Sequence, residues 1–209
     1  MGLDSSWQFL GGPGSWSYRL FDNRREKLNR RLIRILIHRI PLGKSARVLE
    51  GGSGPGYASS CFARQSGVRL SIASDKDPAA LGEARRRDKT LPVVAADLYR
   101  LPFKTEAFDM VWNSSTLEHL ERIETAFSEM CRVTRQGGWI FVGVPYRFGP
   151  LGFQPLIKNS LLGKWLGPVF GRRDLVRLAK TRGLNPQSLF TYFYGCFIGI
   201  IARKPEGKA

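Results

Sequence analysis

Residues 48–56, VLEGGSGPG, decide the fold that we expect for this chain. A short apolar strand ends in an acidic residue, Glu50, and a glycine-rich turn follows it. Glycines allow a sharp turn and let backbone N–H groups approach a ligand closely. The loop alone is compatible with a dinucleotide site, a methyl-donor site or a purely structural turn.

Strand and helix patterns alternate on both sides of this loop. Apolar or alternating stretches predict strands at 47–50, 68–74, 92–96, 108–112 and 139–144. Helical patterns occupy 57–65, 78–87 and 123–133, and a basic amphipathic helix spans 22–39. Short links between alternating elements predict an α/β fold with a mostly parallel sheet covered on both faces. A helix at 172–181 and strands at 189–193 and 197–202 complete the chain.

Three local signals set helix boundaries. Asp77 is expected to be an N-cap residue with Pro78 at the first helical position. Gly137 and Gly138 are expected to stop the helix at 123–133.

A second acidic residue, Asp75, ends the next predicted strand and lies 19 residues after Gly56. A carboxylate there can accept hydrogen bonds from both hydroxyls of a ribose. This feature fits NAD and S-adenosylmethionine equally. However, the spacing Gly52-x-Gly54-x-Gly56 departs from the G-x-G-x-x-G dinucleotide fingerprint.

Three further blocks follow in order: ADLYRLPF at 96–103, FDMVWNSSTLEHL at 108–120 and RVTRQGGWIFVGVP at 132–145. With the glycine loop, they make the chain resemble the class I S-adenosylmethionine-dependent methyltransferases, in the subgroup called methyltransferase type 11. The resemblance covers residues 45–145 well and extends loosely to Lys204. It implies a Rossmann-like, seven-stranded, mostly parallel sheet with helices on both faces and a C-terminal antiparallel hairpin. It also implies S-adenosyl-L-methionine as cofactor and S-adenosyl-L-homocysteine as product.

The resemblance assigns cofactor-binding roles to matching positions. Asp75 would bind the ribose hydroxyls, with Lys76 beside the adenine. Asp97 would accept from the adenine amino group, and Leu98 would supply a backbone contact. Carboxylates at such turns also cap helices, so a capping role stays open for them. The methionine portion and ribose would be held by Glu50, Gly51, Gly52, Ser53, Gly54 and Gly56, with Asn113 and Ser114 lining the methionine and sulfonium side.

His119 is the candidate general base, because a neutral imidazole is available near neutral pH. A packing or capping role is the alternative, because relatives with different substrates share the LEHL segment. Glu118 and Tyr146 are further candidates at the same edge. We expect no metal site, since the three cysteines are far apart and the chain has only two histidines.

We expect one methyltransferase domain over residues 1–209. A basic helical extension at 1–43 precedes the cofactor-binding core at 44–145. Residues 146–171, apolar and interrupted by glycine and proline, form a candidate lid insertion; a packed insertion without ligand contact is the alternative. Residues 172–209 form the C-terminal helix and hairpin.

The net charge of +16 comes from two flanks. Residues 17–48 and 158–209 each carry ten Lys and Arg against two Asp and Glu, while the remainder is balanced. Basic segments attract phosphates, nucleic acid or an anionic membrane surface. If both flanks frame the substrate entrance, the acceptor is a small or lipid-like molecule with an anionic group.

Two other functions remain open. One is an RNA methyltransferase, although Asn113-Ser114-Ser115-Thr116 replaces the Asn/Asp-Pro-Pro-aromatic motif used on exocyclic amines. The other is a non-catalytic S-adenosylmethionine-binding protein. The sequence shows no apolar run of roughly 18 residues and no secretory signal, so we expect a cytoplasmic protein, with peripheral membrane association left open. Nothing in the sequence indicates an oligomeric state.

Overall fold

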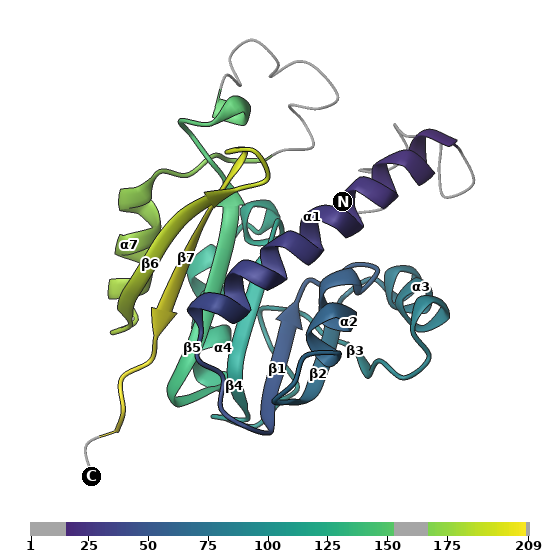
Figure 1. Cartoon of the computed structure of the whole chain (residues 1–209). Helices are drawn as coiled ribbons and strands as arrows, with labels where there is room; N and C mark the ends of the chain where they lie inside the picture. Colours follow the sequence, from purple (N-terminus) through teal and green to yellow (C-terminus); the bar gives the residue numbers. More distant parts are fainter. Residues whose placement is uncertain (1–15, 153–166, 208–209) are drawn as a thin grey trace.

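The computed structural model describes residues 16–152 and 167–207, with side chains from residue 24 onward. Its centre is a seven-stranded sheet in the order β3-β2-β1-β4-β5-β7-β6 (Figure 1). The strands are β1 Ala46–Gly51, β2 Val68–Asp75, β3 Val93–Ala95, β4 Phe108–Ser114, β5 Thr134–Pro145, β6 Asn185–Tyr192 and β7 Phe197–Arg203. The helices are α1 Trp16–Arg39, α2 Tyr57–Ala63, α3 Pro78–Arg87, α4 Ile123–Val133 and α7 Arg172–Lys180, with short 3-10 turns η3 Leu117–His119 and η4 Pro150–Gly152.

The strand directions match the expected architecture. Strands β1, β2, β3, β4 and β5 pair in parallel. Strand β7 pairs antiparallel with both β5 and β6, which makes the C-terminal hairpin part of the same sheet. The predicted α/β fold with a mostly parallel seven-stranded sheet and a C-terminal antiparallel hairpin is therefore confirmed.

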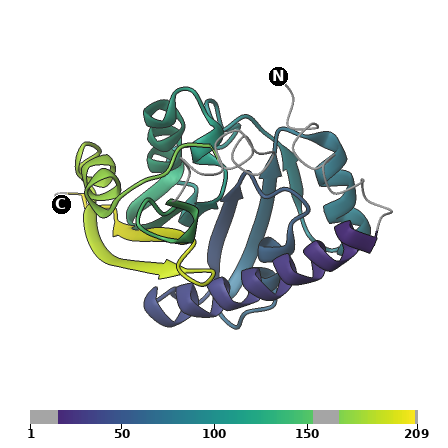
Figure 2. The same ribbon diagram turned by 90° about the horizontal axis from the view of Figure 1, so that it is seen from above.

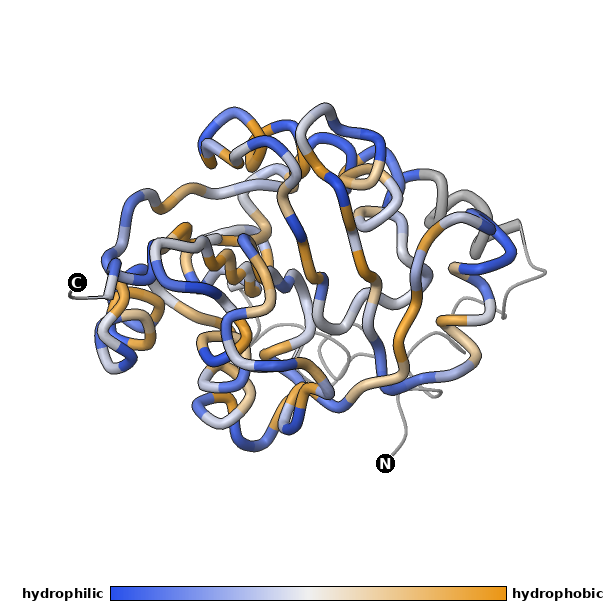
Figure 3. Tube along the Cα trace, turned by 90° about the horizontal axis from the view of Figure 1, so that it is seen from below, coloured by the Kyte–Doolittle hydropathy of each residue, from blue (hydrophilic) through white to orange (hydrophobic). Residues whose placement is uncertain are grey.

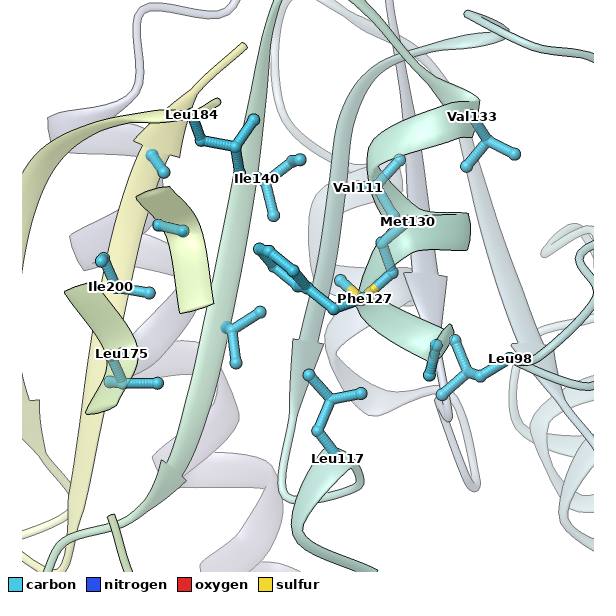
Figure 4. Close-up of a cluster of buried hydrophobic side chains, with 14 of the residues drawn as sticks. Leu98, Val111, Leu117, Phe127, Met130, Val133, Ile140, Leu175, Leu184 and Ile200 are labelled. Carbon is cyan, nitrogen blue, oxygen red and sulfur yellow. The ribbon is translucent and has the colours of Figure 1, made fainter. Parts of the chain in front are cut away.

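Helices cover both faces of the sheet. Seen from above, α1 runs along one face, and α4 and α7 lie on the other (Figure 2). The first face buries Leu32, Ile33 and Leu36 of α1 against Phe62 and Trp112. On the second face, side chains of α4 and α7 form the larger cluster with β4, β5 and β7 (Figure 4).

Hydropathy follows this layering. Apolar stretches run along the strands, and polar stretches gather in the peripheral loops (Figure 3). Along α1, hydrophobic and hydrophilic residues alternate, because its apolar stripe is buried while Arg24, Lys27 and Arg34 are exposed. The amphipathic pattern of α1 thus reflects the packing of its apolar stripe on the core.

The predicted start of α3 is confirmed, and the start of α1 differs from the prediction. Asp77 is the N-cap of α3, where its Oδ1 accepts a hydrogen bond from the Ala79 N–H at 2.9 Å, and Pro78 opens the helix. Helix α1 begins at Trp16, six residues before the expected start.

The predicted stop of α4 at Gly137-Gly138 is wrong. The helix ends at Val133, and β5 begins directly at Thr134, whose backbone is already extended. The two glycines lie inside β5, where the pairing with β4 jumps from Thr134 to Trp139. Gly137 has φ of +66°, so the glycines form a bulge in the strand.

The two ends of the candidate lid are paired at the carboxyl edge of the sheet. The Arg147 N–H donates to the Phe170 carbonyl, and the Phe170 N–H donates to the Pro145 carbonyl, both at 2.9 Å. Residues 153–166 of this predicted segment lie outside the described residues. Among the described helices, none is long and apolar enough to cross a membrane.

Candidate functional site

The candidate site lies where the strand order reverses. Strand β1 has β2 on one side and β4 on the other, so the chain moves outward in both directions from this pair. In open α/β sheets, ligands bind beyond the carboxyl ends of the strands at such a switch point. The loop after β1 emerges there.

This glycine loop has a conformation that requires glycine. Gly52, Gly54 and Gly56 have φ of +70°, +52° and +69°, values that side chains disfavour. A Cβ at Gly52 would stand 2.5 Å from Cγ2 of Thr116, and one at Gly56 would stand 3.0 Å from Cβ of Ala84. The loop therefore forms a tight backbone cradle held against the segment that follows β4.

Asp75 anchors the cradle from the end of β2. Its Oδ2 accepts from the Gly54 N–H at 2.7 Å, and its Oδ1 accepts from the Asp77 N–H at 3.0 Å. A carboxylate has about four lone-pair sites, so both oxygens keep acceptor capacity for a ligand hydroxyl. Ser53 joins the same strand end, because its N–H donates to the Ser74 carbonyl at 2.9 Å.

Glu50 faces inward beneath the loop. The Ser59 hydroxyl donates a hydrogen bond to its Oε2. Burial raises the pKa of Glu50 to about 8, against the lowering effect of the Ser59 hydrogen bonds; Asp75 raises it further and Arg25 lowers it. This geometry makes Glu50 a support for the cradle and leaves little of its surface for a ligand.

Asn113 also acts inside the protein. Its Nδ2 donates to the Gly51 carbonyl, and its Oδ1 accepts from the Leu117 N–H at 3.3 Å. The side chain is fully buried, so Asn113 ties the loop after β1 to the turn after β4. Ser114 Oγ lies 2.8 Å from the Tyr192 hydroxyl and thereby links β4 to the hairpin.

The predicted adenine-side residues lie at the ends of β2 and β3. Lys76 is exposed. Asp97 is exposed, and its Oδ1 accepts from the Tyr99 N–H at 2.9 Å. Leu98 is buried, and its Cδ2 lies 2.5 Å from the position of a Cβ at Gly51, so it closes the floor of the loop.

Three residues absent from the sequence-based site lie against the cradle or beside Ser114. Nη2 of Arg25 in α1 stands 3.6 Å from the position of a Cβ at Gly54, and its guanidinium lies over the ring of Tyr57, 5.7 Å from the centroid. Thr116 Oγ1 donates to the Gly52 carbonyl at 3.2 Å. Tyr192 reaches Ser114 from β6. Of these three residues, the sequence indicated only Arg25, because it lies in the predicted basic helix at 22–39.

The candidate general bases differ in environment. His119 is exposed, and partial desolvation lowers its pKa from the ordinary value. Glu118 is 3% exposed, and burial raises its pKa to about 8. Tyr146 is half-buried and packs edge-on against Phe148, with ring centroids 5.9 Å apart.

A small cavity of about 160 Å³ lies between α1 and the turn that joins β6 to β7. Arg31 Nη1 donates to the Tyr194 hydroxyl at 3.1 Å across its rim. The lining is otherwise mainly apolar and aromatic: Leu28, Leu32, Ile35, Tyr192 and Phe193.

Within residues 167–207, the basic side chains of the second flank do not line this cavity. Arg172, Arg173, Arg177 and Lys180 of α7 surround a separate hollow of about 760 Å³, together with Leu189 of β6. Helix α7 packs on the face opposite α1, so the expectation that both flanks frame one entrance needs correction. No group of three or more metal-ligating side chains occurs in the described part of the chain.

The cradle, Asp75 and the exposed edge at Lys76 and Asp97 fit a ligand with a ribose and an adenine. The backbone amides and carbonyls of the loop can meet a polar amino-acid tail, and no phosphate-binding spacing is present. This donor set agrees with S-adenosylmethionine.

Comparisons with known proteins agree with this geometry. Residues 49–142 match the family model described as "Methyltransferase domain". Malonyl-[acyl-carrier protein] O-methyltransferase of Enterobacter lignolyticus is 34% identical over 112 residues, which cover 54% of this chain and 44% of the relative. Demethylmenaquinone methyltransferase of Beutenbergia cavernae is 38% identical over 142 residues, which cover 68% of this chain and 54% of the relative. The chain thus spans about half the length of the curated relatives it matches.

A solved structure shares the whole fold. It is a chain from the complex between the Haloferax volcanii Trm112 methyltransferase activator and a methyltransferase, with a TM-score of 0.75 and 16% identity. The match covers 88% of this chain and 94% of that one. With the family model over β1 to β5, these findings lead to one identification: the chain carries a methyltransferase domain of the class I S-adenosylmethionine-dependent family, in the methyltransferase type 11 subgroup.

Proposed function

We propose that this protein transfers the methyl group of S-adenosyl-L-methionine to a small or lipid-like acceptor that carries an anionic group. The observation that carries the proposal is the glycine cradle at the strand-order reversal, held by Asp75. When bound, the cofactor supplies a methyl group that its sulfonium makes electrophilic. The protein has to place the acceptor in line and exclude water.

The cofactor would lie across the carboxyl ends of β1 and β2. The backbone of Gly52, Ser53 and Gly54 would meet the methionine portion, while Asp75 would accept from the ribose hydroxyls. Lys76 and Asp97 would lie along the adenine, with the Leu98 backbone beside it. Asn113 and Glu50 would act by fixing the loop from below, since their polar atoms bond within the protein.

The acceptor side is supported by the cavity between α1 and the hairpin. Its lining is mostly apolar, and Arg31 supplies a positive charge at the rim. Exposed arginines of α1, among them Arg30 and Arg34, continue that charge along the helix. An apolar body with an anionic end matches such a surface better than a neutral polar metabolite does.

The names of the relatives favour acceptors outside nucleic acids, because the two are named for malonyl-[acyl-carrier protein] and for demethylmenaquinone. A structured RNA would also meet the basic face of α1, and its binding would weaken steeply with salt. A cofactor-binding protein without turnover is the third outcome of the test below.

The test measures S-adenosylhomocysteine release from S-adenosylmethionine in the presence of pooled lipid, metabolite or RNA fractions. We expect release with the lipid or metabolite fraction. Asp75→Asn should abolish that release, while Glu83→Gln, a matched change on α3, should preserve it. Release with the RNA fraction alone would favour an RNA methyltransferase. S-adenosylmethionine binding without S-adenosylhomocysteine release in any fraction would favour a non-catalytic S-adenosylmethionine-binding protein.

A further inference from the structure

Glu118 differs from the other buried carboxylates of this protein. Its Oε2 is buried and has no hydrogen-bond partner, and it is the ionisable group among the unpartnered buried polar atoms of the described residues. By contrast, Glu50 accepts from Ser59, and Asp75 accepts two backbone N–H groups. A buried carboxylate oxygen without a partner destabilises a fold, so packing alone does not explain a glutamate at this position.

The position of Glu118 relates it to both halves of the site. Two residues earlier, Thr116 contacts the Gly52 carbonyl of the cofactor cradle. Leu117 belongs to the core cluster under α4 (Figure 4), which fixes η3. Gly167, from the far end of the candidate lid, stands over the same turn, because a Cβ there would lie 3.1 Å from the Glu118 carbonyl.

Among the described residues, no charged side chain shifts the pKa of this carboxyl, which burial raises. Tyr192 of β6 is a titratable group close enough to sense it: burial above all raises the pKa of the Tyr192 hydroxyl, the Ser114 hydrogen bond lowers it, and the Glu118 charge adds to the rise. Tyr192 also bonds to Ser114 and lines the acceptor cavity, so this one side chain senses the Glu118 charge and forms part of the cavity. His119, on the same turn, is exposed.

We propose that Glu118 is the general base for the methyl acceptor, and that the acceptor attacks through a neutral hydroxyl or phenol attached to an apolar body. This inference rests on the proposed function and narrows its substrate class. An acceptor that attacks through an ionised carboxylate needs no base, so the unpartnered Oε2 of Glu118 would have no role in its methylation.

The Glu118 carboxylate takes the proton of the acceptor O–H while an oxygen lone pair forms the bond to the methyl carbon. The carbon–sulfur bond breaks, and its electron pair stays on sulfur. The products are a methyl ether, a neutral thioether and protonated Glu118, which returns its proton to solvent when product leaves.

The experiment uses the full chain and two amphiphiles with the same tail, 4-octylphenol and 4-octylbenzoate. Binding to the protein saturated with S-adenosylhomocysteine is measured by calorimetry, and methylation is measured by mass spectrometry. The variants are Glu118→Gln, Glu118→Leu and the matched control Glu121→Gln, an exposed glutamate on the same segment.

We expect octylphenol to be methylated by the wild type, and kcat to fall roughly 100-fold or more in Glu118→Gln. The affinity for S-adenosylmethionine should change less than about twofold, since only the acceptor side is altered. The rise of kcat/KM with pH toward about 8 should disappear in this variant, and Glu121→Gln should behave as wild type. Glu118→Leu should fold, and it should be inactive on the phenol.

Equal turnover of octylphenol by wild type and Glu118→Gln would overturn the inference. So would a protein that binds S-adenosylmethionine but methylates only the benzoate, or binds neither amphiphile; in those cases the proposed function would stand. Failure to bind S-adenosylmethionine at all would instead reject the proposed function itself.

Discussion

The cofactor cradle differs from the acceptor wall, by which we mean Glu118 and residues 192–194, in how its polar side chains are satisfied. In the cradle, carboxylates and amides such as Asp75 and Asn113 have partners inside the protein. In the acceptor wall, Glu118 has an unpartnered oxygen, Tyr194 is 79% exposed and Phe193 has a positive φ. The contrast suggests that the cradle is complete before ligand arrives, whereas the acceptor wall is completed by its ligand.

The largest expected effect comes from breaking the cradle. In Gly52→Val, the side chain needs a disfavoured φ and collides with Thr116. Strain and overpacking of about 1–3 kcal/mol each should weaken S-adenosylmethionine binding roughly 100-fold or more. Calorimetry checks this, with circular dichroism to verify folding.

Gly82→Ala is the matched control, because a Cβ at Gly82 meets open space in the middle of α3. It should raise stability by about 1 kcal/mol and leave cofactor binding unchanged. Undiminished binding in Gly52→Val would show that the tight loop is not the cofactor site.

The next effect is the pH dependence of stability that Glu118 contributes. Its pKa is about 8 in the folded protein and 4.5 in the ordinary state. The folded state therefore holds a proton that the unfolded state loses, and this stabilisation is complete below pH 4.5 and lost as the pH rises toward about 8. Over that window, the free energy of unfolding should fall by up to about 4 kcal/mol through this group.

Urea unfolding at several pH values checks this prediction. Glu50 has a similar pKa and contributes the same trend, so the informative quantity is the difference between wild type and Glu118→Gln. We expect the variant to gain stability relative to wild type as the pH rises, and Glu121→Gln to follow wild type. Parallel curves for all three proteins would mean that Glu118 is not held in its protonated form.

The basic side chains of α1 and α7 lie on opposite faces of the sheet, so charge reversal on the two helices should affect anion binding differently. Reversing Arg30, Arg31 and Arg34 to Glu should weaken binding of dodecyl phosphate by roughly tenfold. The positive side chains that attract the phosphate near the partly apolar cavity become negative and repel it. Reversing Arg172, Arg173 and Arg177 changes the net charge equally and is the control. Equal loss in both triple variants, measured by calorimetry, would mean that net charge rather than the α1 rim attracts the anion.

The smallest expected effect is at the hairpin turn. Tyr194 has φ of +58°, and its hydroxyl bonds to Arg31. Tyr194→Asn suits this backbone, so the free energy of unfolding should change by less than about 0.5 kcal/mol. Octylphenol affinity should fall severalfold, because the aromatic surface at the mouth is lost. A large loss of stability with unchanged affinity would make the turn a structural element only.

The sequence predicted the cradle better than the acceptor wall for a physical reason. Asp75, Asp77 and Pro78 act through neighbours a few residues away, so their pattern is visible in the chain. Apolar runs likewise located β1, β2 and β4 to within two residues at either end. Thr134-Arg135-Gln136 is polar, however, and the pairing of Thr134 with Phe108 is the contact with β4 at this end of β5.

The acceptor wall depends on long-range contacts. Tyr192 meets Ser114 across 78 positions, and Arg31 meets Tyr194 across 163. In LEHL, two adjacent polar residues suggest an exposed turn, yet Glu118 is buried while His119 is exposed. The local pattern favoured His119 as the base, because burial and missing partners are properties of the folded chain.

The most direct test of the central claim is calorimetric titration of the full chain with S-adenosylmethionine and, separately, with NAD. We predict saturable one-to-one binding of S-adenosylmethionine, lost in Asp75→Asn, and no saturable binding of NAD. Tighter binding of NAD, or S-adenosylmethionine binding that is unaffected by Asp75→Asn, would contradict the assignment of the cradle to the methyl donor.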